Sequence, residues 1–328
     1  MPDGHHDPPG DPRILGAPAA FSPAVDAEVG QVARHLHTSE PATPTGSTSK
    51  RGGLGVVFWI AAGWVGLTVL LALLAPFLPL QSPTFQDYSV VNLGPSTHHL
   101  LGTDDLGRDM LSRIIWGSRD SLVISIVSVV VGMLIGGSAA MVAGYWGRKV
   151  DAVLNAASFV VLAFPPLLFI LAVEAFWKPP LKSIELWKLV VMFTVVAAPQ
   201  LFRVMRASTL AVSNREFVVA ARSMGASTWR ILTREILPNV LPAALSFALI
   251  GIALAVIIEG ALAFLGLSVA LPTPTLGNLI NEAAQIYNLK ANPTAALWPS
   301  LYIFFLVVGL NLMGDRLRST FDVREGNL

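Results

Sequence analysis

The chain contains no cysteine and few charged residues. Of its 328 residues, 13% are Asp, Glu, Lys or Arg, whereas 53% are hydrophobic, and the formal net charge is +1. Without cysteine, the chain can form no disulfide, thiol nucleophile or thiolate metal ligand. A net charge so close to zero gives no overall attraction to nucleic acid or to acidic substrates, so the placement of the charges carries the information.

Apolar runs of nearly membrane-spanning length fill most of the sequence. A transmembrane helix needs roughly 20 consecutive, mostly apolar residues, and the sequence therefore predicts an all-α integral membrane protein with six spans. The spans are expected at about 54–80, 121–145, 153–177, 187–205, 240–267 and 297–313. Pro165 and Pro166 fall in the third, and Pro199 and Gln200 interrupt the fourth, which is the weakest. Such prolines are tolerated where neighbouring helices satisfy the freed backbone groups.

The rest of the chain divides around these spans. Residues 1–53 are rich in Pro, Gly, Ser and Thr and show no apolar periodicity, which predicts a disordered N-terminal tail. We expect residues 54–120 to form the first span with an external loop, residues 121–315 to form the core, and residues 316–328 to form a C-terminal tail.

The placement of Lys and Arg predicts the orientation. With the N-terminus inside, the cytoplasmic segments hold 15 of the 22 Lys and Arg residues and the external loops hold 7. Because cytoplasmic loops carry an excess of basic residues, we expect an N-in, C-in topology with both tails in the cytoplasm. At one cytoplasmic span end, Asp151 is expected to form a surface pair with its neighbours Arg148 and Lys149.

Segment 213–239, between the fourth and fifth spans, is polar and strongly basic although apolar runs flank it. Ser213 followed by Glu216 has the spacing of a capping box, which predicts that a helix begins there. Helical spacing would place four apolar residues of this helix on one face. They are Phe217, Ala220, Ala221 and Met224.

A glycine divides this segment into two helices. Gly225 can adopt the left-handed conformation that ends a helix, and Ser227 can cap a second one. Pro238 should close the second helix just before the fifth span. The apolar stripe of the second helix would consist of Trp229, Leu232 and Ile236.

Two short basic helices on a cytoplasmic loop have three interpretations. A DNA-reading helix-turn-helix would need a soluble domain around it, which the flanking spans do not provide, so we expect no nucleic-acid partner. An interfacial loop lying on anionic membrane lipid is compatible with the arginines. Docking into another protein is the interpretation that we favour.

The run EFVVAARSMGASTWRILTREILPN carries a resemblance to a known family. It resembles the EAA loop of bacterial ABC importer permeases, which in that family is the coupling helix, seated in a groove of the ATP-hydrolysing subunit. The pattern matches at Glu216, Ala220, Ala221 and Gly225 and at the Leu237–Pro238 ending. The resemblance therefore implies ATPase coupling by Glu216, Ala220, Ala221, Gly225, Ala226, Ser227, Thr228 and Arg230.

Three further segments narrow the resemblance. His98–Leu122, Glu259–Ala283 and Asn311–Arg324 are similar to the C-type permeases of oligopeptide, dipeptide, nickel and glutathione importers. This implies a six-helix, type I importer permease in the bacterial inner membrane, most consistent with oligopeptides or dipeptides, with nickel or glutathione as alternatives.

The resemblance also implies a set of partners. They are a homologous B-type permease, two ATP-binding subunits or one fused subunit, and an external solute-binding protein. ATP and magnesium would be bound by the ATPase subunits, and we expect no cofactor on this chain.

The chain shows no constellation of residues that supports catalysis. It lacks a phosphate-binding motif and a nucleophile elbow, which predicts a transport subunit and not an enzyme. Asp104, Asp105 and Asp109 cluster in the expected external loop, but their spacing fits no calcium loop. Because Gly102 and Gly107 indicate a tight turn, we interpret the cluster as loop architecture and expect no metal site.

Glu259 lies well inside the fifth expected span and is the intramembrane polar candidate. A carboxyl group is costly in lipid and normally faces a partner helix or a watery cavity. We favour a structural pairing with another helix over contact with the solute. The alternative function from another class is a secondary carrier driven by an ion gradient, with Glu259 as its proton or sodium site.

Overall fold

The computed structural model describes residues 55–176 and 185–325. The predicted tail 1–53 lies outside these residues, as do the expected span ends at Leu54 and Trp177. The long helices are α2 (Gly55–Leu74), α3 (Met110–Trp146), α4 (Arg148–Leu162), α5 (Pro166–Phe176), α6 (Glu185–Ser213), α9 (Leu237–Phe264) and α12 (Thr294–Glu325). The short helices are α7 (Glu216–Ser223), α8 (Thr228–Arg230), α10 (Leu276–Ala283) and α11 (Ile286–Ala291).

The described residues contain five helices that are long and apolar enough to cross a membrane. Four of the spans come from α2, α3, α6 and α12, and the fifth runs without a break from α8 into α9. Together with one bent pair of helices, they give up to six spans, so the all-α membrane fold predicted from the sequence is confirmed.

The third expected span is not one straight helix. The chain breaks between α4 and α5, and the two helices meet at an angle of 80°, as in a broken span or a re-entrant loop. Pro165 and Pro166 explain the break, because proline disfavours helical geometry in the residue before it and cannot donate a backbone hydrogen bond. Pro166 then opens α5, where its fixed φ suits the first turn.

Several spans extend well beyond their predicted ends, and α12, expected to end near residue 313, continues to Glu325. Helix α3 begins at Met110 and not near Ser121, because the carboxylate of Asp109 caps it by accepting from the Ser112 amide at 2.8 Å. Helix α6 continues through Pro199 to Ser213. These extensions carry polar residues, which hydropathy alone assigns to loops.

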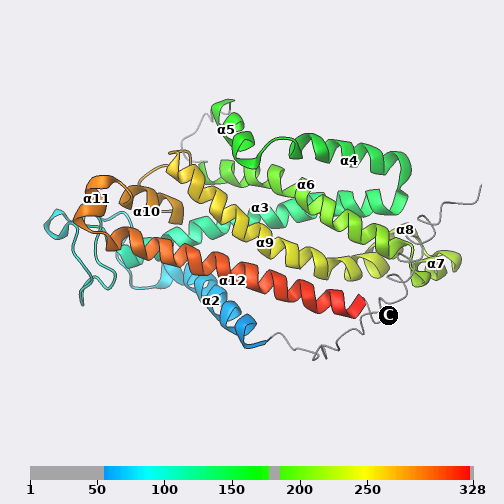
Figure 1. The fold of residues 1–328 in the computed structure, drawn as a ribbon, viewed down its shortest axis with the longest axis horizontal. Helices are drawn as coiled ribbons and strands as arrows, with labels where there is room; N and C mark the ends of the chain where they lie inside the picture. The colour runs from blue at the N-terminus through cyan, green and yellow to red at the C-terminus, as the bar shows by residue number, and fades with distance from the viewer. Residues whose placement is uncertain (1–54, 177–184, 326–328) are drawn as a thin grey trace, which may run out of the picture. The chain divides into compact units, whose positions relative to one another are not determined.

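The central contact of the fold joins α3 to α6 (Figure 1). Small residues of α3 let the two backbones approach closely, as is common between membrane helices. They include Gly132, Gly136, Gly137 and Gly144. Helix α9 packs on α3 and α6, while α12 packs on α9 and α2.

The bundle has two distinct ends. Helices α7 and α8 lie at one end, together with the last turns of α12 (Figure 1). Helices α10 and α11 lie at the opposite end with the loop that precedes α3. Each end therefore gathers polar segments that are far apart in the sequence.

Candidate functional site

The first helix of the loop between α6 and α9 begins later than the capping-box pattern predicts. Ser213 is the last residue of α6, and its hydroxyl donates to the Leu210 carbonyl at 3.2 Å. Helix α7 starts at Glu216 behind an extended Arg215, without a side-chain cap. The predicted Ser213 cap is therefore wrong, because the preceding helical turn uses the Ser213 hydroxyl.

The division of the loop at Gly225 is confirmed. Gly225 has φ +79°, in the region that favours glycine, and follows Met224, the C-cap of α7. Ser227 caps α8, its Oγ accepting from the Arg230 amide at 3.4 Å. The two helices therefore meet at a turn that residues with a Cβ adopt only under strain.

Pro238 does not end the second helix, contrary to the prediction. Helix α8 passes through a π-helical turn, Ile231–Ile236, into α9, and the Leu237 amide donates to the Leu232 carbonyl five residues back. A wider turn is what a proline at 238 requires, because in an α-helix its ring would clash with the Arg234 carbonyl. The loop is thus continuous with a span.

One side of the α7–α8 loop is packed into the core. Val218 and Ala221 are buried in α7, and Ile231, Leu232 and Ile236 are buried in the π turn. They form one cluster with residues of α3 and α6. Of the two predicted apolar faces, Ala221, Leu232 and Ile236 are buried, whereas the other members are exposed and the buried face of α7 runs through Val218. The exposed members are Phe217, Ala220, Met224 and Trp229.

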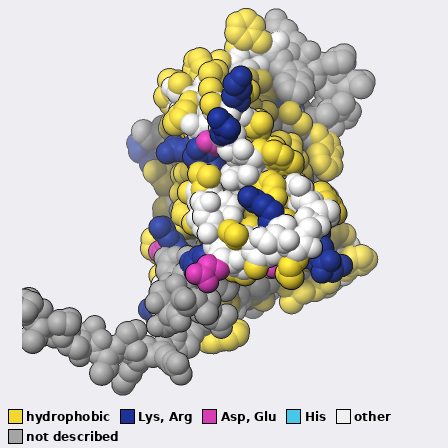
Figure 2. Space-filling model, turned by 90° about the vertical axis from the view of Figure 1, so that its right-hand side faces the viewer, with side chains coloured by type: hydrophobic (Ala, Val, Ile, Leu, Met, Phe, Trp, Pro, Cys, Tyr) yellow, Lys and Arg dark blue, Asp and Glu magenta, His cyan; other side chains and the backbone are white. Residues whose placement is uncertain are grey.

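The other side of the loop exposes large apolar side chains. Met224 is 81% exposed, Trp229 76%, Val219 51% and Phe217 42%. We call these four residues the α7–α8 patch. Exposed arginines accompany the patch, and Figure 2 shows hydrophobic and basic side chains together on this end. The arginines of the loop are Arg215, Arg222, Arg230 and Arg234.

The residues that the EAA pattern singles out mostly face solvent. Ala221 is the buried member, and Ala226 and Thr228 are half-buried. The exposed members are Glu216, Ala220, Gly225, Ser227 and Arg230. A loop with one packed side and one apolar, basic, exposed side is suited to receive another protein.

Glu259 lies near the end of α9 and is fully buried. Its carboxylate accepts hydrogen bonds from Ser268 at 2.6 Å, from Thr275 at 2.7 Å and from Ser121 of α3 at 3.1 Å. The carboxylate therefore ties α9 to α3 and to the segment before α10. This geometry matches the structural pairing that we favour from the sequence.

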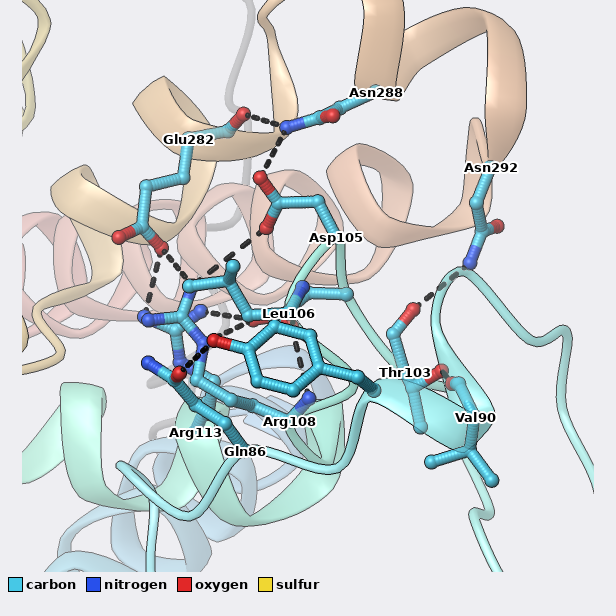
Figure 3. A network of polar contacts seen from close by, with 12 residues as sticks. Gln86, Val90, Thr103, Asp105, Leu106, Arg108, Arg113, Glu282, Asn288 and Asn292 are labelled. Atoms are coloured by element: carbon cyan, nitrogen blue, oxygen red, sulfur yellow. Dashed lines mark hydrogen bonds and ion pairs between the residues drawn. The ribbon is translucent and has the colours of Figure 1, made fainter.

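A second polar centre, at the α10–α11 end, was not predicted from the sequence. Arg108 and Arg113 are buried and share two carboxylates (Figure 3). Arg108 donates to Asp104 at 2.6 Å and to Glu282 at 3.1 Å, while Arg113 forms ion pairs with the same two residues, at 2.7 Å to Glu282. The cluster fastens the start of α3 to α10.

Asparagines extend this cluster to α11. Asn288 donates to Asp105 at 2.9 Å, and Asn292 donates to the carbonyls of Thr103 at 3.0 Å and Leu93 at 3.2 Å (Figure 3). The aspartates of this loop thus serve ion pairs and helix capping, as the interpretation of loop architecture predicts. Asp105 contacts Asn288, 183 residues further along the chain, and nothing in the local sequence signals this contact.

Two more ion pairs join the bent pair of helices to α6. Arg206 of α6 forms a two-pronged pair with Asp151 of α4, with Nη2 and Oδ2 2.5 Å apart. Lys188 of α6 pairs with Glu174 of α5. The predicted pairing of Asp151 with its sequence neighbours is wrong, because α4 turns the carboxylate toward α6.

Comparison with known proteins identifies the family. Residues 128–325 match the family model described as binding-protein-dependent transport system inner membrane component. Glutathione transport system permease protein GsiD of Pectobacterium atrosepticum is 37% identical over 265 residues, 80% of this chain and 86% of that protein. Dipeptide transport system permease protein DppC of Haemophilus influenzae is 33% identical over 279 residues, 83% of this chain and 90% of that protein.

A solved structure supports the fold. A chain in a structure of the MetNI methionine ABC transporter, in inward-facing conformations, superposes with a TM-score of 0.54 and 22% identity. The superposition covers 64% of this chain and 97% of the other, so the ABC importer permease fold is shared. Because the family model matches more than half of the sequence, this chain belongs to the binding-protein-dependent transport system inner membrane components, as a multi-pass permease subunit that is not itself an enzyme.

Proposed function

We propose that the chain is the C-type permease of an ATP-driven importer of oligopeptides or dipeptides. It would form half of the translocation pathway beside a homologous B-type permease, above two ATP-binding subunits or one fused subunit. An external binding protein would deliver the solute. Relatives named for dipeptide and for glutathione transport match with similar identity, so glutathione is the nearest alternative cargo and nickel a more distant one.

The observation that carries this proposal is the α7–α8 patch. Soluble partners bind through exposed apolar anchors surrounded by polar residues, and Trp and Arg are enriched among the strongest anchors. Trp229 and Met224 are such anchors on a loop whose opposite side is packed into the core. We infer that an ATPase subunit covers this patch, with the N-in, C-in orientation placing it in the cytoplasm.

The continuity of α8 with α9 gives the patch a mechanical role. ATP and magnesium would be held by the partner subunits, whose closure moves the patch as a rigid body. Because no loop separates α8 from α9, the movement passes into a span that packs on α3, α6 and α12. Coupling therefore depends on the turn at Gly225 and on the contacts of α7.

Coupling variants in reconstituted complexes test the proposal. Gly225→Pro distorts the turn, and Glu216→Lys reverses a charge at the exposed start of α7. Both are expected to uncouple ATP hydrolysis from uptake while the chain remains inserted and assembled. Trp59 is an exposed tryptophan on α2, and Trp59→Ala serves as the control for a surface substitution outside the loop. This variant should transport normally. Normal uptake by both loop variants would contradict the proposal.

Competition experiments test the cargo separately. Uptake of a labelled dipeptide should be inhibited by unlabelled di-, tri- or pentapeptides, and the inhibiting lengths define the size range. Inhibition by glutathione or nickel alone, with indifference to all peptides, would remove the peptide assignment while leaving the ATP-driven mechanism in place.

A further inference from the structure

A groove of about 250 Å³ lies among the middles of α3, α6 and α9. Its lining is apolar apart from the side chains of Ser128 and Gln200. The Ser128 hydroxyl is already engaged with the carbonyls of Ile124, at 2.6 Å, and Val190, at 3.0 Å. Gln200 is therefore the lining residue whose polarity has no structural explanation.

The Gln200 carboxamide forms no hydrogen bond with any residue that the structure describes, and its side chain is half-buried. A carboxamide offers two donor hydrogens and one acceptor oxygen. Gln200 lies near the middle of α6, about 20 Å from either end at 1.5 Å per residue. An unpaired amide at this depth is costly in lipid, so the groove should face water or a polar ligand.

Helix packing does not require the groove to be as wide as it is. Gly251 of α9 lines it, and a Cβ added there would meet its nearest neighbour, Val129, at an ordinary 3.6 Å. An alanine at 251 would therefore fit against α3 while narrowing the groove. The glycine therefore leaves room in the groove beside the Gln200 amide.

We propose that this groove is the wall that the chain contributes to the translocation pathway, and that Gln200 exchanges hydrogen bonds with the peptide bonds of the passing solute. The inference rests on the proposed function. Each peptide bond presents one donor and one acceptor, which complement a carboxamide, while the apolar lining accepts side chains of many kinds. Nickel would instead require nitrogen, oxygen or sulfur ligands around an ion. The backbone of a neighbouring helix would not serve as the partner of Gln200, because its N–H and C=O groups are already hydrogen-bonded within that helix.

Because the chain contains no cysteine, single cysteines test the proposal directly. Gln200→Cys and Leu254→Cys, both in the groove, are compared with Leu67→Cys and Leu70→Cys on the exposed face of α2. The complete importer in proteoliposomes is treated with a membrane-impermeant methanethiosulfonate reagent, and modification is read from the mass of this chain. Groove cysteines should react, and saturating transported dipeptide should slow their reaction several-fold. The α2 cysteines should stay unmodified.

Two results would overturn the inference. Failure of both groove cysteines to react would mean that lipid or a partner helix fills the groove. Reaction that the dipeptide does not slow would mean that the groove holds water only. Normal ATP-driven dipeptide uptake by the wild-type complex in the same preparation would show that the proposed function survives either result.

The role of Gln200 in recognition has its own readout. Gln200→Leu should raise the KM for dipeptide uptake about tenfold, the loss expected for one hydrogen bond. An N-methylated dipeptide lacks the peptide N–H. It should compete less well than the parent dipeptide for uptake by the wild type, whereas the two should compete equally well for uptake by Gln200→Leu. An unchanged preference in Gln200→Leu would overturn the assignment.

Discussion

Gly136 of α3 lies so close to Ala198 of α6 that a Cβ added to the glycine would be 2.1 Å from the Ala198 carbonyl oxygen. This distance is far below any real contact, and the obstructing atom belongs to the backbone, so a substitution must push the helices apart. The α3–α6 contact that organises the bundle therefore depends on this glycine.

Gly136→Ala should destabilise the protein by about 1–3 kcal/mol, the usual cost of overpacking. Thermal unfolding of the purified complex in detergent measures the effect. Gly251→Ala is the matched control, since it is also a mid-helix glycine but its added Cβ would meet its nearest neighbour at 3.6 Å. Equal melting temperatures for the two variants would refute the close-packing argument.

Glu282→Gln should be strongly destabilising, because it removes the charge shared by Arg108 and Arg113. Both arginines are nearly fully buried but keep Asp104 as a partner, so the cost should lie below the roughly 3–5 kcal/mol of a buried charge left without any partner. Arg119→Ala provides the comparison, since the Arg119 side chain is 42% exposed and lies 3.9 Å from Asp120, a pair worth at most about 1 kcal/mol. Thermal unfolding should separate the two variants clearly, and similar melting points would mean that Glu282 contributes little.

A double-mutant cycle tests the contact between α4 and α6. Asp151→Asn and Arg206→Gln should show a coupling energy of up to about 1 kcal/mol, as expected for a partly exposed, two-pronged pair. The parallel cycle of Asp151→Asn with Arg148→Gln should show none, because Arg148 is only a sequence neighbour. Coupling with Arg148 in place of Arg206 would restore the pairing predicted from the sequence.

Glu259→Gln separates a structural role from an ion-coupled one. The Ser121 and Thr275 hydroxyls donate to the carboxylate while accepting from the amides of Leu276 and Asn278, so an amide NH₂ at 259 would face groups already oriented to donate. We expect a lower melting temperature but ATP-driven uptake that needs no ion gradient in either protein. Uptake by the wild type that requires a proton or sodium gradient would favour the carrier mechanism.

The sequence predicted the helices well because hydropathy and helix caps are local properties. It located the spans containing Phe58, Ile124 and Leu306, and it placed the turn at Gly225 and the cap at Ser227. It failed where one local signal competed with another. Ser213 matches a helix start but is used to end α6, and Pro238 matches a helix end but is absorbed by a π turn.

The ion pairs between helices could not be predicted, because they join residues distant in the sequence. Glu282 meets Arg113, and Asp151 meets Arg206, only after the helices pack. The charge count used for orientation treated Arg108, Arg113 and Lys188 as loop residues, although all three are buried in ion pairs. Gln200 was noticed only as an interruption of a span, and its place in the groove depends on α9.

The central claim is that an ATPase subunit covers the α7–α8 patch. A photo-crosslinking amino acid placed at position 224, in membranes from cells producing all the subunits, tests the claim most directly, with position 67 on α2 as the control. Our account predicts an adduct between this chain and the ATP-binding subunit from position 224 and none from position 67. Full uptake with no ATPase adduct at 224, or an equal adduct from 67, would contradict it.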